Sequence, residues 1–300
     1  MQNKTIDFET YLKDFNYQEH EKIRKSKMKK EILLTLLITT LSMAQEYPKG
    51  KLGDVVKLGE DIINHTDTNP LSKTYVKSKL QCVNCHRKGK DNRAGTVNTI
   101  GTFIGTATSF PAYSKRHKDI ISLQNRIDGC FTRCLNGSKS VVNTKVGIAV
   151  ESYIAWLSTG LPIKMSSVAP RTPSKIEMWS KNRKKFSVLF KKATHQNYLN
   201  GKRLYTRECA SCHGDDGQGK GTFPPLWGDT SYTADGSMAK LPNSATWIKD
   251  NMPLNNAHLT DEQSADITLY INAQPRPKYK GFKIEDNFKK LGLDLKKIKN

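Results

Sequence analysis

Four of the six cysteines in this chain form two copies of one motif, and a histidine directly follows each copy. The first copy reads Cys-Val-Asn-Cys-His and the second reads Cys-Ala-Ser-Cys-His. Over one helical turn this spacing places two thiols beneath the two vinyl groups of a haem, and the adjoining histidine reaches the iron. A redox dithiol or a zinc site would leave the histidine after each pair unexplained. The motifs therefore predict two covalently bound haem c groups, held by Cys82, Cys85 and His86 and by Cys209, Cys212 and His213.

The second motif is followed by a candidate for the other axial ligand of its iron. Met252 lies about forty residues after His213, next to a proline. Small cytochromes c place a methionine loop at this distance, and a Met-Pro pair at the end of a helix holds the sulfur on a fixed loop. Met238 is the competing ligand, and either methionine could instead fill a gap in the core.

The first motif has no comparable methionine, because only Met165 lies between it and the next predicted segment. His117, a lysine, or one of the two remaining cysteines must then complete the iron. Cys130 and Cys134 are four residues apart in a helical pattern and so face the same way. A disulfide between them is the alternative, although one helical turn rarely meets disulfide geometry. Two buried free thiols would leave the iron without an obvious partner.

Apolar spacing predicts an all-α fold of two cytochrome c-type helical domains joined by a linker, because strand signals are weak throughout. The helices are expected over residues 55–64, 121–135, 144–157, 196–205 and 261–272. A Ser-, Pro- and Thr-rich stretch predicts the linker, and the Lys-rich end predicts a solvated tail, with docking of an acidic partner as its alternative. The expected parts are an N-terminal extension or misassigned start (1–27), a signal peptide (28–44), domain 1 (45–165), the linker (166–192), domain 2 (193–275) and the basic tail (276–300).

The predicted signal peptide begins at an internal methionine, Met28. Two lysines follow it, then an apolar run over residues 32–41, and Ser42-Met43-Ala44 forms a small-residue cleavage site. The apolar run is far shorter than the roughly 20 residues that span a bilayer. We therefore expect cleavage after Ala44, export to the periplasm, where c-type haem is attached, and no membrane span in the mature protein.

The formal net charge is +21, and residues 1–44 carry 8 Lys/Arg against 6 Asp/Glu, so about +19 remains on the rest of the chain. Such a field attracts anions. Export excludes nucleic acid as the partner. Small oxyanions, acidic redox partners or a membrane surface remain as candidates.

The segment around the two unassigned cysteines carries a resemblance to a known family. It reads FPAY from Phe110 and ISLQNRIDGCFTRCLNG from Ile121, and the second half contains GKRLYTRECASCHG, FPPLWG and NMPL. These stretches resemble the dihaem thiosulfate dehydrogenases, also studied as tetrathionate reductases. The likeness spans roughly residues 50–275. Its specific part is the segment around Cys130, because haem motifs alone are shared by many cytochromes.

The resemblance implies a role for each of these residues. The haem of domain 1 would be the active site, with Cys130 on the iron opposite His86, and the haem of domain 2 would transfer electrons. Arg116 and Arg126 correspond to the family's substrate arginines. Cys134 departs from the family, which usually carries a serine there that is thought to help bind substrate. This change affects substrate affinity or reaction direction and brings a second thiol beside the reactive sulfur.

The implied chemistry agrees with the residue types. Thiosulfate is a small dianion, so joining two of them requires fixed guanidiniums with several donors, and Arg126 lies four residues before Cys130 on the same predicted helix. The hypothesis is that Cys130 leaves the iron, bonds to one thiosulfate, and is released when a second thiosulfate expels tetrathionate. Two electrons pass to the two haems and then to an external cytochrome. Thiolate ligation should lower the reduction potential of the haem in domain 1, and thioether ligation should raise that of the haem in domain 2.

Three other functions fit parts of the pattern. In a non-catalytic dihaem electron carrier, the first iron would be bound by a histidine and a methionine or by a histidine and a lysine. A sulfur-oxidation cytochrome that joins thiosulfate to a carrier protein would depend on that protein. A dihaem peroxidase would turn over hydrogen peroxide.

Overall fold

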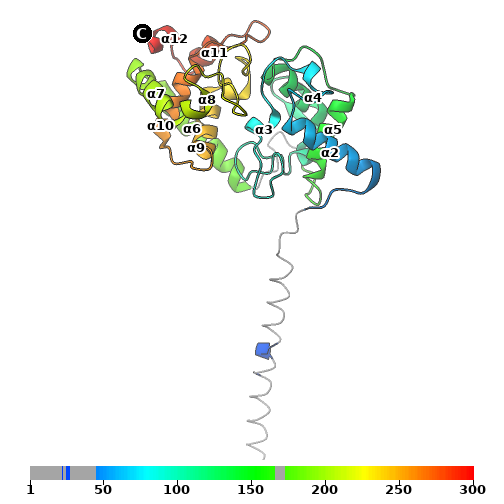
Figure 1. Ribbon diagram of the computed structural model, residues 1–300. Helices are drawn as coiled ribbons and strands as arrows, with labels where there is room; N and C mark the ends of the chain where they lie inside the picture. Colours follow the sequence, from blue (N-terminus) through cyan, green and yellow to red (C-terminus); the bar gives the residue numbers. More distant parts are fainter. Residues whose placement is uncertain (1–21, 23–24, 28–44, 166–172) are drawn as a thin grey trace, which may run out of the picture. The chain divides into compact units, whose positions relative to one another are not determined.

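The fold is built around two pairs of packed helices, one pair in each half of the chain (Figure 1). The computed structural model describes residues 22, 25–27, 45–165 and 173–300, without the side chains of 173–179, and residues 47–300 form one compact unit. The predicted signal peptide (28–44), most of the extension (1–27) and the start of the predicted linker (166–172) lie outside the described residues. Helices dominate this structure, as the sequence predicts.

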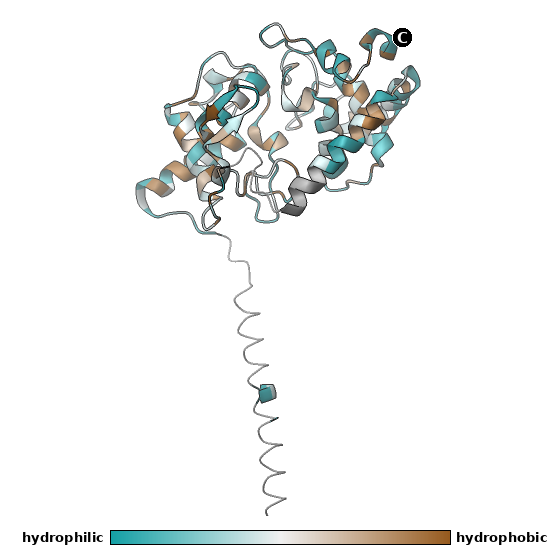
Figure 2. Ribbon diagram, turned by 180° about the vertical axis from the view of Figure 1, so that it is seen from behind, coloured by the Kyte–Doolittle hydropathy of each residue, from teal (hydrophilic) through white to brown (hydrophobic). Residues whose placement is uncertain are grey.

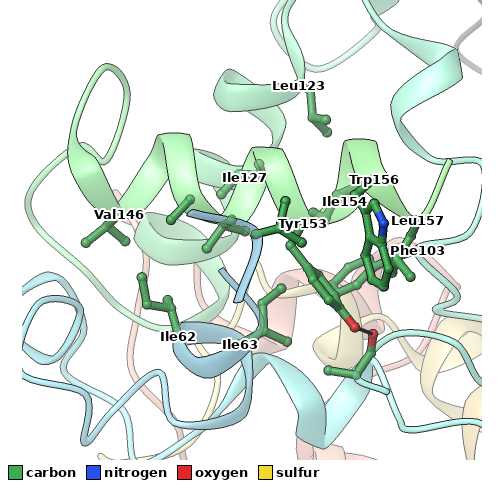
Figure 3. Packing of buried hydrophobic residues seen from close by; sticks show 14 of the residues in the cluster. Ile62, Ile63, Phe103, Leu123, Ile127, Val146, Tyr153, Ile154, Trp156 and Leu157 are labelled. Carbon is green, nitrogen blue, oxygen red and sulfur yellow. Dashed lines mark hydrogen bonds between the residues drawn. The ribbon is translucent and has the colours of Figure 1, made fainter. Parts of the chain in front are cut away.

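The first helix pair consists of α2 (Gly50–Asn64) and α5 (Lys145–Trp156). Helix α5 begins where the Thr144 hydroxyl accepts a hydrogen bond from the backbone of Gly147. A Cβ added at Gly59 would lie 2.0 Å from the Ala149 carbonyl oxygen, so only glycine allows this approach. Apolar side chains of α2 then point toward α5 and form the core of this lobe (Figure 3).

The second pair, α7 (His195–Glu208) and α10 (Asp261–Asn272), repeats this design. A Cβ at Gly201 would lie 1.9 Å from the Asp266 carbonyl oxygen. Helix α10 begins at a capping box formed by Thr260 and Gln263, and its bounds are those that the sequence predicts. The two lobes are therefore built on the same crossing of a helix before the Cys-x-x-Cys-His motif with a helix after it.

The motifs themselves form short helical turns, α3 (Cys82–Cys85) and α8 (Ala210–His213). Each follows the first helix of its pair, so the pair positions the motif against the lobe core. Hydrophobic and hydrophilic residues alternate along the helices, as one buried face per helix requires (Figure 2).

The segment expected as one helix over residues 121–135 contains the end of a strand, a short helix and a π-type turn. Strands β1 (Ala112–Ser114) and β2 (Asp119–Ile121) form an antiparallel hairpin, and helix α4 (Leu123–Gly129) begins at the Ser122 cap. The element η3 (Cys130–Cys134) is a π-type turn. The spacing of apolar residues could not distinguish the π-type turn from a continuing α-helix, because the two differ by only one residue per hydrogen-bonded ring.

Most of the predicted linker is helical, because helix α6 spans Pro173–Lys191. Phe186 and Phe190 on this helix are 0% and 1% exposed and pack in the core of the second lobe. Four residues separate them, which places both on one helix face. The segment was predicted as a linker because its composition is dominated by polar and basic residues, and two apolar residues change that composition little.

The expectation of a solvated C-terminal tail is wrong. Helices α11 (Ile284–Lys289) and α12 (Leu295–Lys299) bury Ile284, Phe288 and Ile298 against the second lobe. Their lysines lie among apolar residues at helical spacing, so composition alone concealed a packed segment. Among the described residues, no helix is long and apolar enough to cross a membrane. The remaining elements are η1 (Lys73–Tyr75), η2 (Ala107–Ser109), η4 (Ser237–Ala239) and α9 (Leu241–Asn251).

Candidate functional site

The first motif holds its histidine in one orientation. His86 Nδ1 lies 2.6 Å from the carbonyl oxygen of Gly101, and the ring stacks on Phe103 with 4.2 Å between centroids. A carbonyl only accepts hydrogen bonds, so Nδ1 carries the proton and Nε2 carries the lone pair that an iron requires. Cys82 is anchored as well, since its backbone N–H donates to the Thr66 hydroxyl at 3.0 Å.

The second motif repeats this arrangement beside a large cavity. His213 Nδ1 lies 2.9 Å from the carbonyl oxygen of Pro224. The cavity, of about 300 Å³, is lined mostly by apolar side chains. Cys209, Cys212 and His213 line it, and so do both candidate methionines, Met238 and Met252. Two thiols, an oriented imidazole and a thioether around one apolar cavity fit a haem c.

The two motifs lie next to each other across this cavity. Cys85 of the first motif lines it together with the residues of the second motif. Trp247 of helix α9 donates its indole N–H to the Cys85 carbonyl oxygen at 3.1 Å. Arg87 donates to the backbone oxygen of Asn251, the residue before Met252, at 3.3 Å. Two cofactors held by these motifs would be close neighbours.

Arg126 contacts the unassigned cysteine directly, because its Nη1 donates to Cys130 Sγ at 3.0 Å. The four-residue spacing predicts this contact. The backbone carbonyl of Cys130 accepts from Leu135 N–H at 3.0 Å, five residues on, which closes the π-turn. π-Turns of this kind frequently occur at functional sites. The thiol of Cys134, at the other end of the turn, donates a hydrogen bond to Cys130 Sγ.

The pKa of Cys130 is shifted in the opposite direction from the pKa values of the first motif's cysteines. Burial raises the pKa of Cys82 and of Cys85 to about 12. The hydrogen bond from Cys134, followed by the charge of Arg126, instead holds the pKa of Cys130 well below its usual range, against the opposing effect of burial and with a smaller contribution from Arg133. The same hydrogen bond and burial raise the pKa of Cys134. These surroundings favour the thiolate form of Cys130 and the thiol form of Cys134.

A second basic group consists of Arg116, Arg133 and Lys240, and the charge of Arg133 acts on both cysteines. Arg116 forms an ion pair with Asp235. Burial, followed by the charges of Arg116 and Arg133, lowers the pKa of Lys240 to about 8. Sequence reasoning missed Arg133 and Lys240. The position of Arg133 between the two cysteines was an available signal, whereas Lys240 comes from the other lobe and has no local signal.

The other candidates for the first iron lie elsewhere. His117 is exposed in the β1–β2 turn, and Met165 is 61% exposed. All six cysteines lie within the described ranges, and no disulfide joins Cys130 to Cys134. Among the cysteines and histidines considered for this iron, Cys130 is the residue that contacts Arg126 and whose pKa is lowered. It is therefore the strongest candidate for the second ligand.

Comparison with known proteins gives matches to both parts of the chain. The family model "Cytochrome c" matches residues 198–275. A protein named thiosulfate dehydrogenase from Allochromatium vinosum is 31% identical over 245 residues, covering 79% of this chain and 84% of that protein. A thiosulfate dehydrogenase from Psychrobacter arcticus is 32% identical, covering 79% of this chain and 69% of that protein.

A solved structure agrees with these matches. It is the thiosulfate dehydrogenase TsdBA from Marichromatium purpuratum, with a TM-score of 0.65 and 30% sequence identity. The likeness covers 80% of this chain and 50% of that chain, so this chain spans about half of its length.

Proposed function

This chain belongs to the thiosulfate dehydrogenase family, and from that premise we propose that it is a c-type cytochrome that oxidises two thiosulfates to tetrathionate, reversibly. The observation that carries the proposal is the contact of Arg126 with Cys130 Sγ at 3.0 Å. It joins an anion-binding group to a nucleophilic sulfur.

Two haem c groups would supply the oxidising equivalents when bound, accepting the two electrons that each tetrathionate releases. Cys82, Cys85 and His86 would hold the first of these groups together with the sulfur of Cys130. We assign the other to Cys209, Cys212 and His213 with Met252. The oriented Nδ1 of each histidine and the apolar cavity that contains Met252 support these ligand sets.

The reaction at Cys130 proceeds in two sulfur-transfer steps. The thiolate bonds to the outer sulfur of one thiosulfate, and two electrons leave the site. A second thiosulfate then attacks that outer sulfur, which forms the central sulfur–sulfur bond of tetrathionate. The bond to Cys130 breaks, and the thiolate is regenerated. Cys130 is the covalent catalyst in this scheme.

The charged groups around Cys130 offset the repulsion between two dianions. Arg126 contacts the reacting sulfur and would hold the first thiosulfate. Arg133, whose charge acts on Cys134, forms a second positive group with Arg116 and Lys240, and this group would receive the second thiosulfate. Such fixed donors favour the crowded transition state over the separated anions.

The electrons would leave through the second lobe to an external cytochrome. Trp247 and Arg87 tie the first motif to the walls of the second cavity, which supports a short route between the two cofactors. The predicted leader, the covalent haem motifs and the basic charge support a periplasmic protein with an acidic electron carrier.

The proposal is tested with purified protein that contains two haems per chain. Thiosulfate with ferricyanide should yield tetrathionate without any added protein partner, and tetrathionate with a reduced viologen dye should yield thiosulfate. Cys130→Gly should abolish both reactions while haem content is unchanged. His117→Gln, in an exposed turn, is the matched control and should keep full activity. Thiosulfate oxidation that persists in Cys130→Gly would contradict the proposal.

A further inference from the structure

A second thiol lies within hydrogen-bonding distance of the reactive sulfur. Cys134 donates its S–H to Cys130 Sγ, and its own sulfur accepts from the backbone N–H of Ser237. A sulfur adduct on Cys130 would therefore form next to a thiol. The Ser237 N–H would stabilise negative charge that develops on Cys134.

The backbone keeps the two sulfurs together. The hydrogen bond from Leu135 N–H to the Cys130 carbonyl oxygen includes both cysteines in one widened turn, which differs from the regular α-helical turn in which a disulfide is rare. Thr132 fixes this turn to helix α4 through the Asp128 carbonyl oxygen at 2.9 Å, and Thr233 fixes it to the second lobe through the Arg133 carbonyl oxygen. Groups oriented in this way within one chain react far faster than separate molecules do.

We propose that Cys134 is a resolving thiol that attacks the sulfur adduct on Cys130 and forms a Cys130–Cys134 disulfide. This inference rests on the proposed function, because it needs thiosulfate or tetrathionate to place sulfur on Cys130. It adds a dithiol route for reducing tetrathionate, in which the cysteine pair supplies both electrons.

The route is balanced in two steps. The Cys130 thiolate attacks tetrathionate, forms a bond to one inner sulfur and releases one thiosulfate. Cys134 then attacks Cys130 Sγ, the bond from Cys130 to the transferred sulfur breaks, and a second thiosulfate leaves. The thiol proton of Cys134 passes to solvent. One tetrathionate is reduced to two thiosulfates, and two thiols are oxidised to one disulfide.

The test uses the ferric holoprotein with excess tetrathionate and no other reductant, so that the cysteines are the electron source under test. Trypsin cleaves after Arg133, between the two cysteines, so a disulfide between them appears as two cross-linked peptides. Mass spectrometry detects the cross-link, and released thiosulfate is counted per chain. Cys134→Ser is the comparison variant, and its haem content and visible spectrum establish that it is folded.

The wild-type protein should give the cross-linked peptides and two thiosulfates per chain. Cys134→Ser should give one thiosulfate and retain the adduct on Cys130. A wild-type protein that keeps the adduct, has a free Cys134 and releases one thiosulfate would overturn this inference and leave the proposed function intact. If Cys130 acquires no sulfur in either protein, the proposed function fails and the inference fails with it.

Discussion

At the residue scale, what distinguishes Cys130 is its polar surroundings. The motif cysteines are buried in an environment that raises their pKa, whereas Cys130 receives a hydrogen bond from a thiol and another from a guanidinium. Both donors favour the negative sulfur. The nucleophilic role proposed for Cys130 follows from these two donors.

Replacing Arg126 should slow the enzyme without removing the cofactors. Arg126→Gln loses a charge-assisted hydrogen bond, which contributes about 1.5–3 kcal/mol, so kcat/KM for thiosulfate should fall between about 10-fold and 150-fold. Arg203→Gln, an exposed arginine on α7 bonded to Asn200, is the control and should leave kcat/KM unchanged. Steady-state kinetics with ferricyanide measure both. Equal losses in the two variants would exclude a specific role for Arg126.

Lys240 should make thiosulfate binding depend on pH. Its pKa is lowered to about 8 by burial and by Arg116 and Arg133, while Asp235 opposes this shift and Lys290 adds to it. The charged form attracts the dianion, so KM should be low below pH 8 and rise as pH increases through 8. Lys240→Arg keeps its charge and should flatten this rise, as measured by KM against pH. An unchanged profile in that variant would exclude Lys240 from the anion site.

At the element scale, the sequence predicted the helices that carry their own signals. The capping box and the apolar face of α10 indicate where this helix begins and ends. The helix before each motif was predicted because each motif is preceded by an amphipathic pattern. The π-turn at Cys130 and the β1–β2 hairpin were not predicted, because neither changes the local apolar pattern. The contact of Arg126 with Cys130 was predictable from spacing, whereas the approach of Lys240 required the packing of the second lobe.

Helix α6 should behave as part of the second lobe and not as a linker. Phe190→Ala removes a side chain that is 1% exposed, so the free energy of unfolding should fall by about 3–5 kcal/mol. Val188→Ala, on the same helix and 52% exposed, should change it by less than about 0.5 kcal/mol. Urea titration followed by circular dichroism compares the two variants. Similar stabilities would show that α6 does not contribute to the core.

At the scale of the whole molecule, positive charge and two neighbouring cofactor sites act together. The net charge, +21 over the chain and about +19 without residues 1–44, raises the local concentration of anions around residues that bind them. Salt screens this field, and the Debye length falls from about 30 Å at 0.01 M to about 3 Å at 1 M. We therefore expect KM for thiosulfate to rise across that range at constant kcat. A KM independent of ionic strength would limit the effect to the charges in direct contact with substrate.

The division of the chain was only partly visible in the sequence. Two motifs predicted two cofactors and two helical lobes, but residues 47–300 pack as one unit because α6 and the C-terminal helices add apolar residues to the second lobe. Contacts such as Trp247 with Cys85 join segments far apart in the chain. Local patterns carry no information about such pairings.

The central claim is that the sulfur of Cys130 lies on the iron held by His86, and electron paramagnetic resonance of the ferric protein tests it most directly. The wild-type protein should show the low-spin signal of a histidine/thiolate haem. Cys130→Gly should lose that signal, retain the signal of the other haem and keep two haems per chain. A spectrum unchanged by the substitution would contradict the account.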